Sequence, residues 1–111
     1  MSQLLKELNE KLDAIITLSL FHQKQVMNSP KGTVVIKEIN DEKYYYLTYR
    51  HLNKVKTKYL GKSGQYNPEE LQDAIALRQH SEATLKQLKH KKQELQAAIK
   101  AVERYNKSHP Q

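Results

Sequence analysis

The residues best suited to binding a partner lie near the middle of the chain, where lysines occupy every second position. Lys54, Lys56 and Lys58 alternate with uncharged residues, and in a β-strand this spacing puts all three on one face. A row of ammonium groups can neutralise nucleic-acid phosphates and release their condensed counterions. Nearby tyrosines can contact sugars and phosphates or stack on bases. The predicted nucleic-acid-binding residues are Lys54, Lys56, Lys58, Arg50, Tyr44, Tyr46 and Lys62.

Positive charge is concentrated in the same stretch. The 111-residue chain has a formal net charge of +7. Residues 31–62 contain eight Lys and Arg residues against three acidic ones, so they supply +5 of that charge, and they hold five of the seven tyrosines. The concentration of charge in one stretch favours a polyanionic partner. The alternative is that the positive charge serves only solubility.

The sequence indicates no catalytic chemistry. The chain has no cysteine, and its five histidines show no metal-ligand spacing such as HExxH. Nucleophile motifs, phosphate-binding loops and glycine-rich dinucleotide loops are also missing. We therefore expect a protein that is not an enzyme and that has no catalytic residue, metal site or cofactor.

An amphipathic helix is predicted before the basic stretch, over residues 2–28. The 3-4-3 spacing of a heptad is followed by Leu5, Leu8, Leu12 and Ile15. The apolar pattern continues through Leu20 and Phe21 and ends before Pro30, because proline and the residue before it disfavour helix. His22 has no partner at ligand spacing, so we expect it at the surface or rim.

A three-stranded antiparallel meander is predicted over residues 33–60, with turns at residues 40–42 and at Leu52–Asn53. One face must be buried, because a small sheet is unstable with both faces in water. The residues expected on the buried face are Val55 and Tyr59, with Leu47 and Tyr45 or Tyr49. The opposite face is expected to carry Lys54, Lys56 and Lys58 beside Tyr44, Tyr46 and Arg50. A one-residue slip in register would reverse the second strand.

A long second helix is predicted over residues 68–106. Asn67 is suited to the N-cap position, Pro68 to the first helical position and Glu70 to a capping box. The heptad spacing continues through Leu71, Arg78, Leu85, Leu88, Lys92, Leu95, Ile99 and Val102. The basic run Lys86–Lys92 is either a solvated helix face or a second stripe that contacts phosphate. The helix is longer than the first, so part of it is expected to remain unpaired and available for self-association.

These elements predict an α+β fold in a single domain over residues 1–111. The N-terminal helix precedes the three-stranded meander, and the long coiled-coil-like helix packs antiparallel on the first helix. Without a cysteine or an apolar run of about 18 residues, the chain is expected to be cytoplasmic, with no membrane partner.

The sequence of the predicted strands also resembles that of known protein families. Residues 44–50 (YYYLTYR) and 54–62 (KVKTKYLGK), preceded by Pro30-Lys31-Gly32, are similar to a family of small uncharacterised bacterial and phage proteins with flanking helices. The family pattern has a glycine-containing turn where this chain has Leu52–Asn53. The strands also loosely resemble the N-terminal DNA-binding sheets of some integrases and transposases. That resemblance implies contact with DNA through Lys54, Lys56, Lys58, Arg50 and outward tyrosines.

The function expected from the sequence is nucleic-acid binding, with DNA favoured over RNA. The sheet would contact the phosphate backbone, and a homodimer would form through the long helix. The alternative is a protein-interaction or adaptor module of a phage or mobile element. In that case the basic surface would meet an acidic surface on a protein partner, such as a nucleic-acid enzyme.

Overall fold

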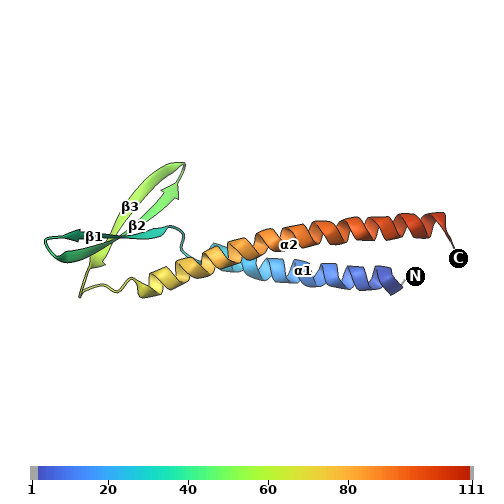
Figure 1. Ribbon diagram of the computed structural model, residues 1–111, viewed down its shortest axis with the longest axis horizontal. Helices are drawn as coiled ribbons and strands as arrows, with labels where there is room; N and C mark the ends of the chain where they lie inside the picture. Colours follow the sequence, from blue (N-terminus) through green and yellow to red (C-terminus); the bar gives the residue numbers. More distant parts are fainter. Residues whose placement is uncertain (1–2, 111) are drawn as a thin grey trace. The chain divides into compact units, whose positions relative to one another are not determined.

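A computed structural model of the chain describes residues 3–110. The elements follow in the order α1 (Gln3–Asn28), β1 (Thr33–Ile39), β2 (Glu42–His51), β3 (Lys54–Lys62) and α2 (Glu69–Ser108) (Figure 1). The predicted α+β element order is confirmed. β3 continues two residues past the predicted end of the sheet, α2 ends at residue 108 rather than 106, and the predicted helical position Ser2 lies outside the described residues.

The chain divides into two compact units. One is helical and comprises the described parts of Met1–Gln25 and Ser81–Gln111, and the other, Val26–His80, contains the sheet. We call them the helical unit and the sheet unit. The single domain expected over residues 1–111 stays a prediction.

In the helical unit, α1 and α2 pack antiparallel, as the sequence predicted (Figure 1). A groove of about 600 Å³ between them is lined by Lys11, Ala14 and Ile15 of α1 and by Lys91, Glu94, Leu95 and Ala98 of α2. The predicted heptad positions of α1 are half-buried, and Leu88 and Ile99 of α2 are buried. Lys92 occupies a half-buried heptad position, where its long aliphatic stem can cover apolar surface.

His22 lies on the side of α1 that contacts α2, at the rim expected from the sequence. It is half-buried, and its Nδ1 forms a 3.1 Å hydrogen bond with Oγ of Ser81, which is only 1% exposed. The heptad of α1 continues from Ile15 through Ser19 and His22 to Val26, all half-buried, while Leu20 and Phe21 are exposed. The polar residues Ser19 and His22 therefore lie on the contact stripe, because helical spacing and not hydrophobicity decides which residues face α2.

The sheet has the predicted meander order β1-β2-β3, with both strand pairs antiparallel. Residues paired across an antiparallel ladder point to the same face. Leu47 pairs with Val34 and Lys58, whereas Tyr46 pairs with Val35 and Tyr59. We name the two sides after these residues. The Leu47 face carries Val34, Ile36, Tyr45, Leu47, Tyr49, Lys54, Lys56 and Lys58, and the Tyr46 face carries Lys37, Tyr44, Tyr46, Arg50, Val55, Tyr59 and Lys62.

The predicted alignment of the faces of β2 and β3 is wrong, because the register differs by one residue from the expected one. Val55 and Tyr59 do not join Leu47 on a buried face; they share the Tyr46 face with Arg50 and are 64% and 53% exposed. Lys54, Lys56 and Lys58 lie beside Tyr49 and Leu47, not beside Tyr44, Tyr46 and Arg50. The two-residue turn that pairs His51 with Lys54 sets this register.

The first turns of α2 lie against the Leu47 face. Ile75 is buried, and with Gln72, Ala76 and Gln79 it lines a depression shared with Gly32–Val34. Leu47, Tyr45 and Tyr49 on this face are half-buried, but so are Tyr44 and Tyr46 on the opposite face, which were expected to be exposed. The extra length of α2 therefore covers part of the sheet, rather than remaining unpaired as expected from the sequence.

Hydrogen bonds fix both connections between the sheet and the helices, the one from α1 to β1 and the one from β3 to α2. Asn67 accepts a hydrogen bond from the backbone N–H of Glu69 at 3.0 Å, which confirms it as the N-cap of α2. At the end of α1, the guanidinium of Arg78 donates to the carbonyl oxygens of Val26 and, at 2.9 Å, Ser29. A cation at this position satisfies carbonyls that have no partner within the helix.

Two-residue turns close both hairpins. Asn40 and Asp41 have φ of 51° and 66°, and Leu52 and Asn53 have φ of 50° and 62°. Positive φ at both central positions is typical of the type I′ turn, whose twist matches that of the strands. Asn and Asp tolerate this conformation, but a leucine is disfavoured there by about 1–2 kcal/mol. Glu42, predicted to be in the first turn, is the first residue of β2.

Candidate nucleic-acid interface

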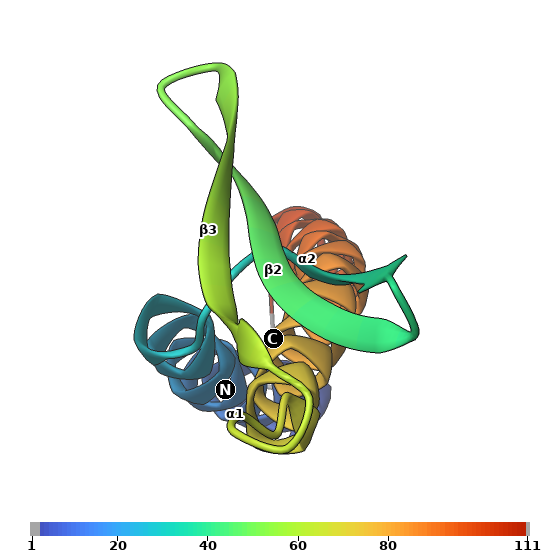
Figure 2. The same cartoon turned by 90° about the vertical axis from the view of Figure 1, so that its left-hand side faces the viewer.

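The β2–β3 hairpin continues past the end of β1. The last pair between β1 and β2 joins Thr33 to Thr48, whereas β2 and β3 remain paired up to His51 and Lys54. Residues 49–56 therefore form a two-stranded extension with no third strand beside it, which we call the ribbon (Figure 2). Every residue of the ribbon except the half-buried Tyr49 is exposed.

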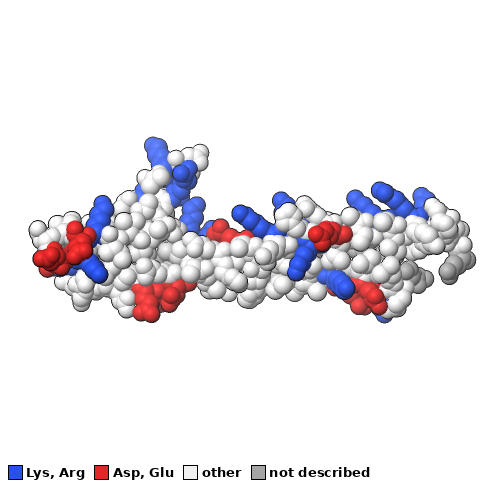
Figure 3. Space-filling model, in the orientation of Figure 1, with Lys and Arg blue, Asp and Glu red and all other residues white. Residues whose placement is uncertain are grey.

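The ribbon and the sequence on either side of it contain no acidic residue. Between Glu42 and Glu69 the sequence has six Lys and Arg residues and neither Asp nor Glu. The ribbon bears cations on both faces, with Arg50 on the Tyr46 face and Lys54 and Lys56 on the Leu47 face. Figure 3 shows basic side chains on the projecting part of the sheet, while acidic side chains lie elsewhere on this view. A surface of one sign attracts counter-charged partners over a Debye length of about 10 Å at 0.1 M salt.

The Tyr46 face combines aromatic rings with cations. The rings of Tyr46 and Tyr59 are 5.4 Å apart and tilted by 56°. The ammonium of Lys37 lies 4.9 Å from the centre of the Tyr46 ring, which is a cation–π distance. Tyr59, a little more than half exposed, can offer part of its ring to a base or sugar.

Glu42 is held by two partners at one end of this face. Its carboxylate forms a 2.8 Å ion pair with Lys62 and accepts a 3.0 Å hydrogen bond from the Tyr44 hydroxyl. These contacts, the one to Lys62 first, lower the pKa of Glu42, and Glu42 in turn raises the pKa values of Lys62 and Tyr44. Part of the positive charge of Lys62 is therefore neutralised, and Arg50 and Lys37 are better placed to meet a phosphate.

The ion pair is expected to make the stability of the sheet unit depend on pH. Because the pKa of Glu42 is lowered in the folded chain, its contribution to stability is present above the ordinary glutamate pKa and is lost as the pH falls through the folded value. Lys62→Met should raise the pKa of Glu42 back towards its ordinary value, measured by NMR titration of the carboxyl carbon. Lys37→Met is the matched control and should leave that pKa unchanged. An unaltered Glu42 titration in Lys62→Met would contradict the assignment.

The structure separates the seven predicted site residues into two groups. Lys54, Lys56 and Lys58 lie on the Leu47 face and are exposed. Tyr44, Tyr46, Arg50 and Lys62 lie on the Tyr46 face. Lys37 and Tyr59 also lie on that face, although the sequence did not predict either as a binding residue and indicated a buried position for Tyr59. The length of the turn was the signal for Tyr59. A two-residue turn pairs His51 with Lys54, and this register places Tyr59 on the same face as Tyr46.

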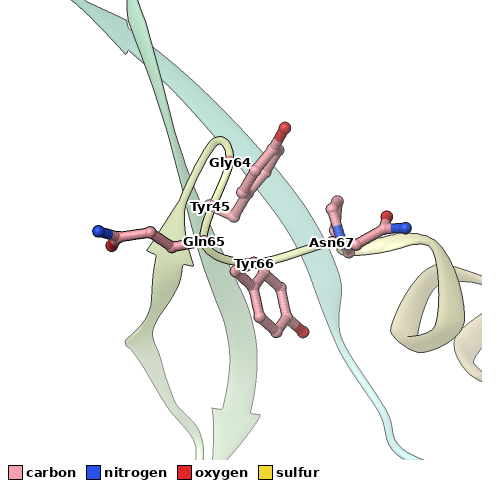
Figure 4. A pocket seen from close by; sticks show the side chains of 6 residues that line it. Tyr45, Gly64, Gln65, Tyr66 and Asn67 are labelled. Atoms are coloured by element: carbon pink, nitrogen blue, oxygen red, sulfur yellow. The ribbon is translucent and has the colours of Figure 1, made fainter.

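A second feature lies where the sheet meets α2. Tyr45 and residues 64–68 line a shallow depression of about 420 Å³, with the Tyr45 and Tyr66 rings 6.2 Å apart (Figure 4). The backbone N–H groups of Gln65 and Tyr66 both donate to the carbonyl of Lys62 at 3.0 Å, which holds this link in a tight turn. The lining side chains are neutral, and we assign the depression a structural role.

The part of the chain that the structure describes, residues 3–110, shows neither a metal cluster nor a membrane-spanning helix. Among them, no group of three or more His, Asp or Glu residues is arranged to hold a metal ion. No helix in that range is both long and apolar enough to cross a membrane. The expected cytoplasmic location and the expectation that the chain is not an enzyme stay predictions.

Comparison with known proteins places most of the chain in a family. The model of a family described as a domain of unknown function (DUF6788) matches residues 1–73, a stretch that contains the complete sheet. No curated protein and no solved structure matches the chain.

Proposed function

Since the chain belongs to the family described as a domain of unknown function (DUF6788), we propose its function from its own surface: it binds nucleic acid, with DNA preferred, through the β2–β3 hairpin. The observation behind this proposal is the absence of any acidic residue between Glu42 and Glu69, combined with exposed cations on both faces of the ribbon. Such a surface suits the phosphate backbone, which accounts for most non-specific affinity.

The two faces have different roles in this proposal. Lys54, Lys56 and Lys58 supply a row of phosphate contacts from β3. Arg50, Lys37 and Tyr59 supply charge and an aromatic surface from the other side of the sheet.

Fluorescence anisotropy with a random-sequence duplex, a single strand and an RNA tests the proposal. We expect micromolar binding whose logarithm falls linearly with the logarithm of salt between about 50 and 200 mM. The slope should correspond to about three to five phosphates. Absence of binding at low salt would contradict the proposal and direct the search to an acidic protein partner.

Charge reversal locates the surface. Lys56→Glu with Lys58→Glu should weaken binding by about 10- to 100-fold and reduce the salt slope by about two, because two phosphate contacts are lost. The matched control is Lys89→Glu with Lys91→Glu on α2, which changes the net charge equally. Loss of binding in the control but not in the sheet variant would move the site to the basic run of α2.

We also propose that the chain self-associates through its helical unit. Among the described residues of α1 none is fully buried, and Leu18, Leu20 and Phe21 are 45–60% exposed. Two helices alone bury little apolar surface, so a second copy on this side of α1 would add to the core. Analytical ultracentrifugation over a range of concentrations tests this, and a mass that stays at one chain throughout would contradict it.

A further inference from the structure

The tip of the ribbon is formed by a residue that is unfavourable for its own turn. Leu52 has a φ of 50° in a type I′ turn, where asparagine or glycine fits best. Its side chain is 82% exposed, so packing within the fold does little to compensate. A backbone conformation that is locally unfavourable and that packing does not explain is a reason to look for a role in binding.

Cations flank this leucine on both strands of the ribbon. Arg50 precedes it on β2, and Lys54 and Lys56 follow it on β3. All three are exposed, with Arg50 on one face of the ribbon and the two lysines on the other. An apolar side chain at the tip, with cations on both faces behind it, fits a ligand that has an apolar interior bordered by anions. Duplex DNA matches that description, with stacked bases between two phosphate backbones.

We propose that Leu52 is a wedge that enters a base step of duplex DNA from the minor groove and kinks the duplex. Proteins that act from this groove insert leucine or similar apolar side chains between base pairs, and the partial unstacking bends the duplex towards the major groove. Only the two turn residues need to enter, while Arg50 on one face and Lys54 and Lys56 on the other contact the flanking phosphates. This inference rests on the proposed DNA binding and adds its geometry: a bent duplex with one opened step.

The variant that tests the wedge is Leu52→Asn, because asparagine suits positive φ and the hairpin should fold at least as well. Dyes at the two ends of a duplex of about 30 base pairs report bending by energy transfer. The unaltered chain should raise the transfer efficiency on binding, and Leu52→Asn should bind without raising it. The unaltered chain should also bind a duplex with a central mismatch about 10-fold more tightly than a perfect one, because the step is already partly unstacked. Leu52→Asn should lose that preference.

Two control variants separate the side chain from the turn. Asn53→Gly also suits the turn and keeps the leucine, so it should bend DNA like the unaltered chain. Leu52→Phe keeps an apolar wedge and should retain bending.

The outcomes distinguish the wedge from the binding on which it rests. If the unaltered chain binds but does not bend the duplex, or if Leu52→Asn bends it equally, the wedge is overturned while the proposed DNA binding stands. If the unaltered chain binds no duplex at low salt, both fail. If Leu52→Asn loses binding to vesicles of phosphatidylserine and phosphatidylcholine but bends DNA normally, the leucine serves a lipid surface and the wedge is overturned.

Discussion

Gly61→Ala is expected to destabilise the sheet unit by about 2 kcal/mol or more. Gly61 has a φ of +155°, and a Cβ atom placed there would lie 2.4 Å from Cβ of Tyr66. That distance is far below contact, and the Cβ of Tyr66 is fixed to its backbone, so no rotamer change can relieve the clash. Urea denaturation followed by tyrosine fluorescence measures the effect, because six of the seven tyrosines lie within Val26–His80.

Gly64→Ala is the matched control for this variant. Gly64 also has positive φ, 88°, but a Cβ at this position would meet no atom within 4 Å. Its substitution should cost only the backbone preference, about 1–2 kcal/mol. The contact between residue 61 and Tyr66 also predicts a rescue. Tyr66→Gly should reduce the destabilisation caused by Gly61→Ala, whereas Tyr66→Ala, which keeps the Cβ, should not. Equal destabilisation at Gly61 and Gly64 would show that the contact with Tyr66 has no effect.

Leu88→Ala is expected to lower the free energy of unfolding of the helical unit by about 2–4 kcal/mol. Leu88 is only 5% exposed and occupies a heptad position of α2, so truncation removes apolar burial and leaves a cavity. Far-UV circular dichroism during urea denaturation reports this loss, because the unit is helical.

Leu77→Ala gives the comparison for Leu88. It makes the same change in the same helix, so helix propensity is matched, but Leu77 is 46% exposed. We expect a change within about 0.5 kcal/mol, as is usual for surface positions. Equal effects at the two leucines would contradict the packing described for the helical unit.

The helices and the strand order could be predicted from the sequence because their signals are local. The 3-4 spacing of apolar residues defined both helices, and Asn67–Pro68 defined the start of the second. Alternation and short polar turns defined three strands. The contact stripe of α1 continues from Ile15 through Ser19 and His22, whereas Leu20 and Phe21, the continuation suggested by hydrophobicity, are exposed.

The faces of the sheet were mispredicted for a different reason. The sequence pattern of β3 suggested that Val55 and Tyr59 are buried, but β3 is an edge strand whose first six residues are all exposed. The two-residue turn at Leu52–Asn53 determines the register, since it places Lys54 opposite His51. With a two-residue turn, this pairing puts Val55 and Tyr59 on the face of Arg50 and Tyr46. The irregularity between Tyr45 and Tyr46, which leaves Leu60 unpaired, could not have been predicted, because a bulge has no clear signal in one sequence.

The alternating lysines of β3 have a consequence for solubility that is independent of any ligand. β3 lies at the edge of the sheet, and an edge strand offers unpaired backbone groups to which another chain can add. Two copies of β3 brought edge to edge would set Lys54, Lys56 and Lys58 against each other, and like charges repel. Neutral apolar replacements at these positions would remove that protection from a strand rich in β-forming residues. Such variants should aggregate, whereas the glutamate variants should stay in solution.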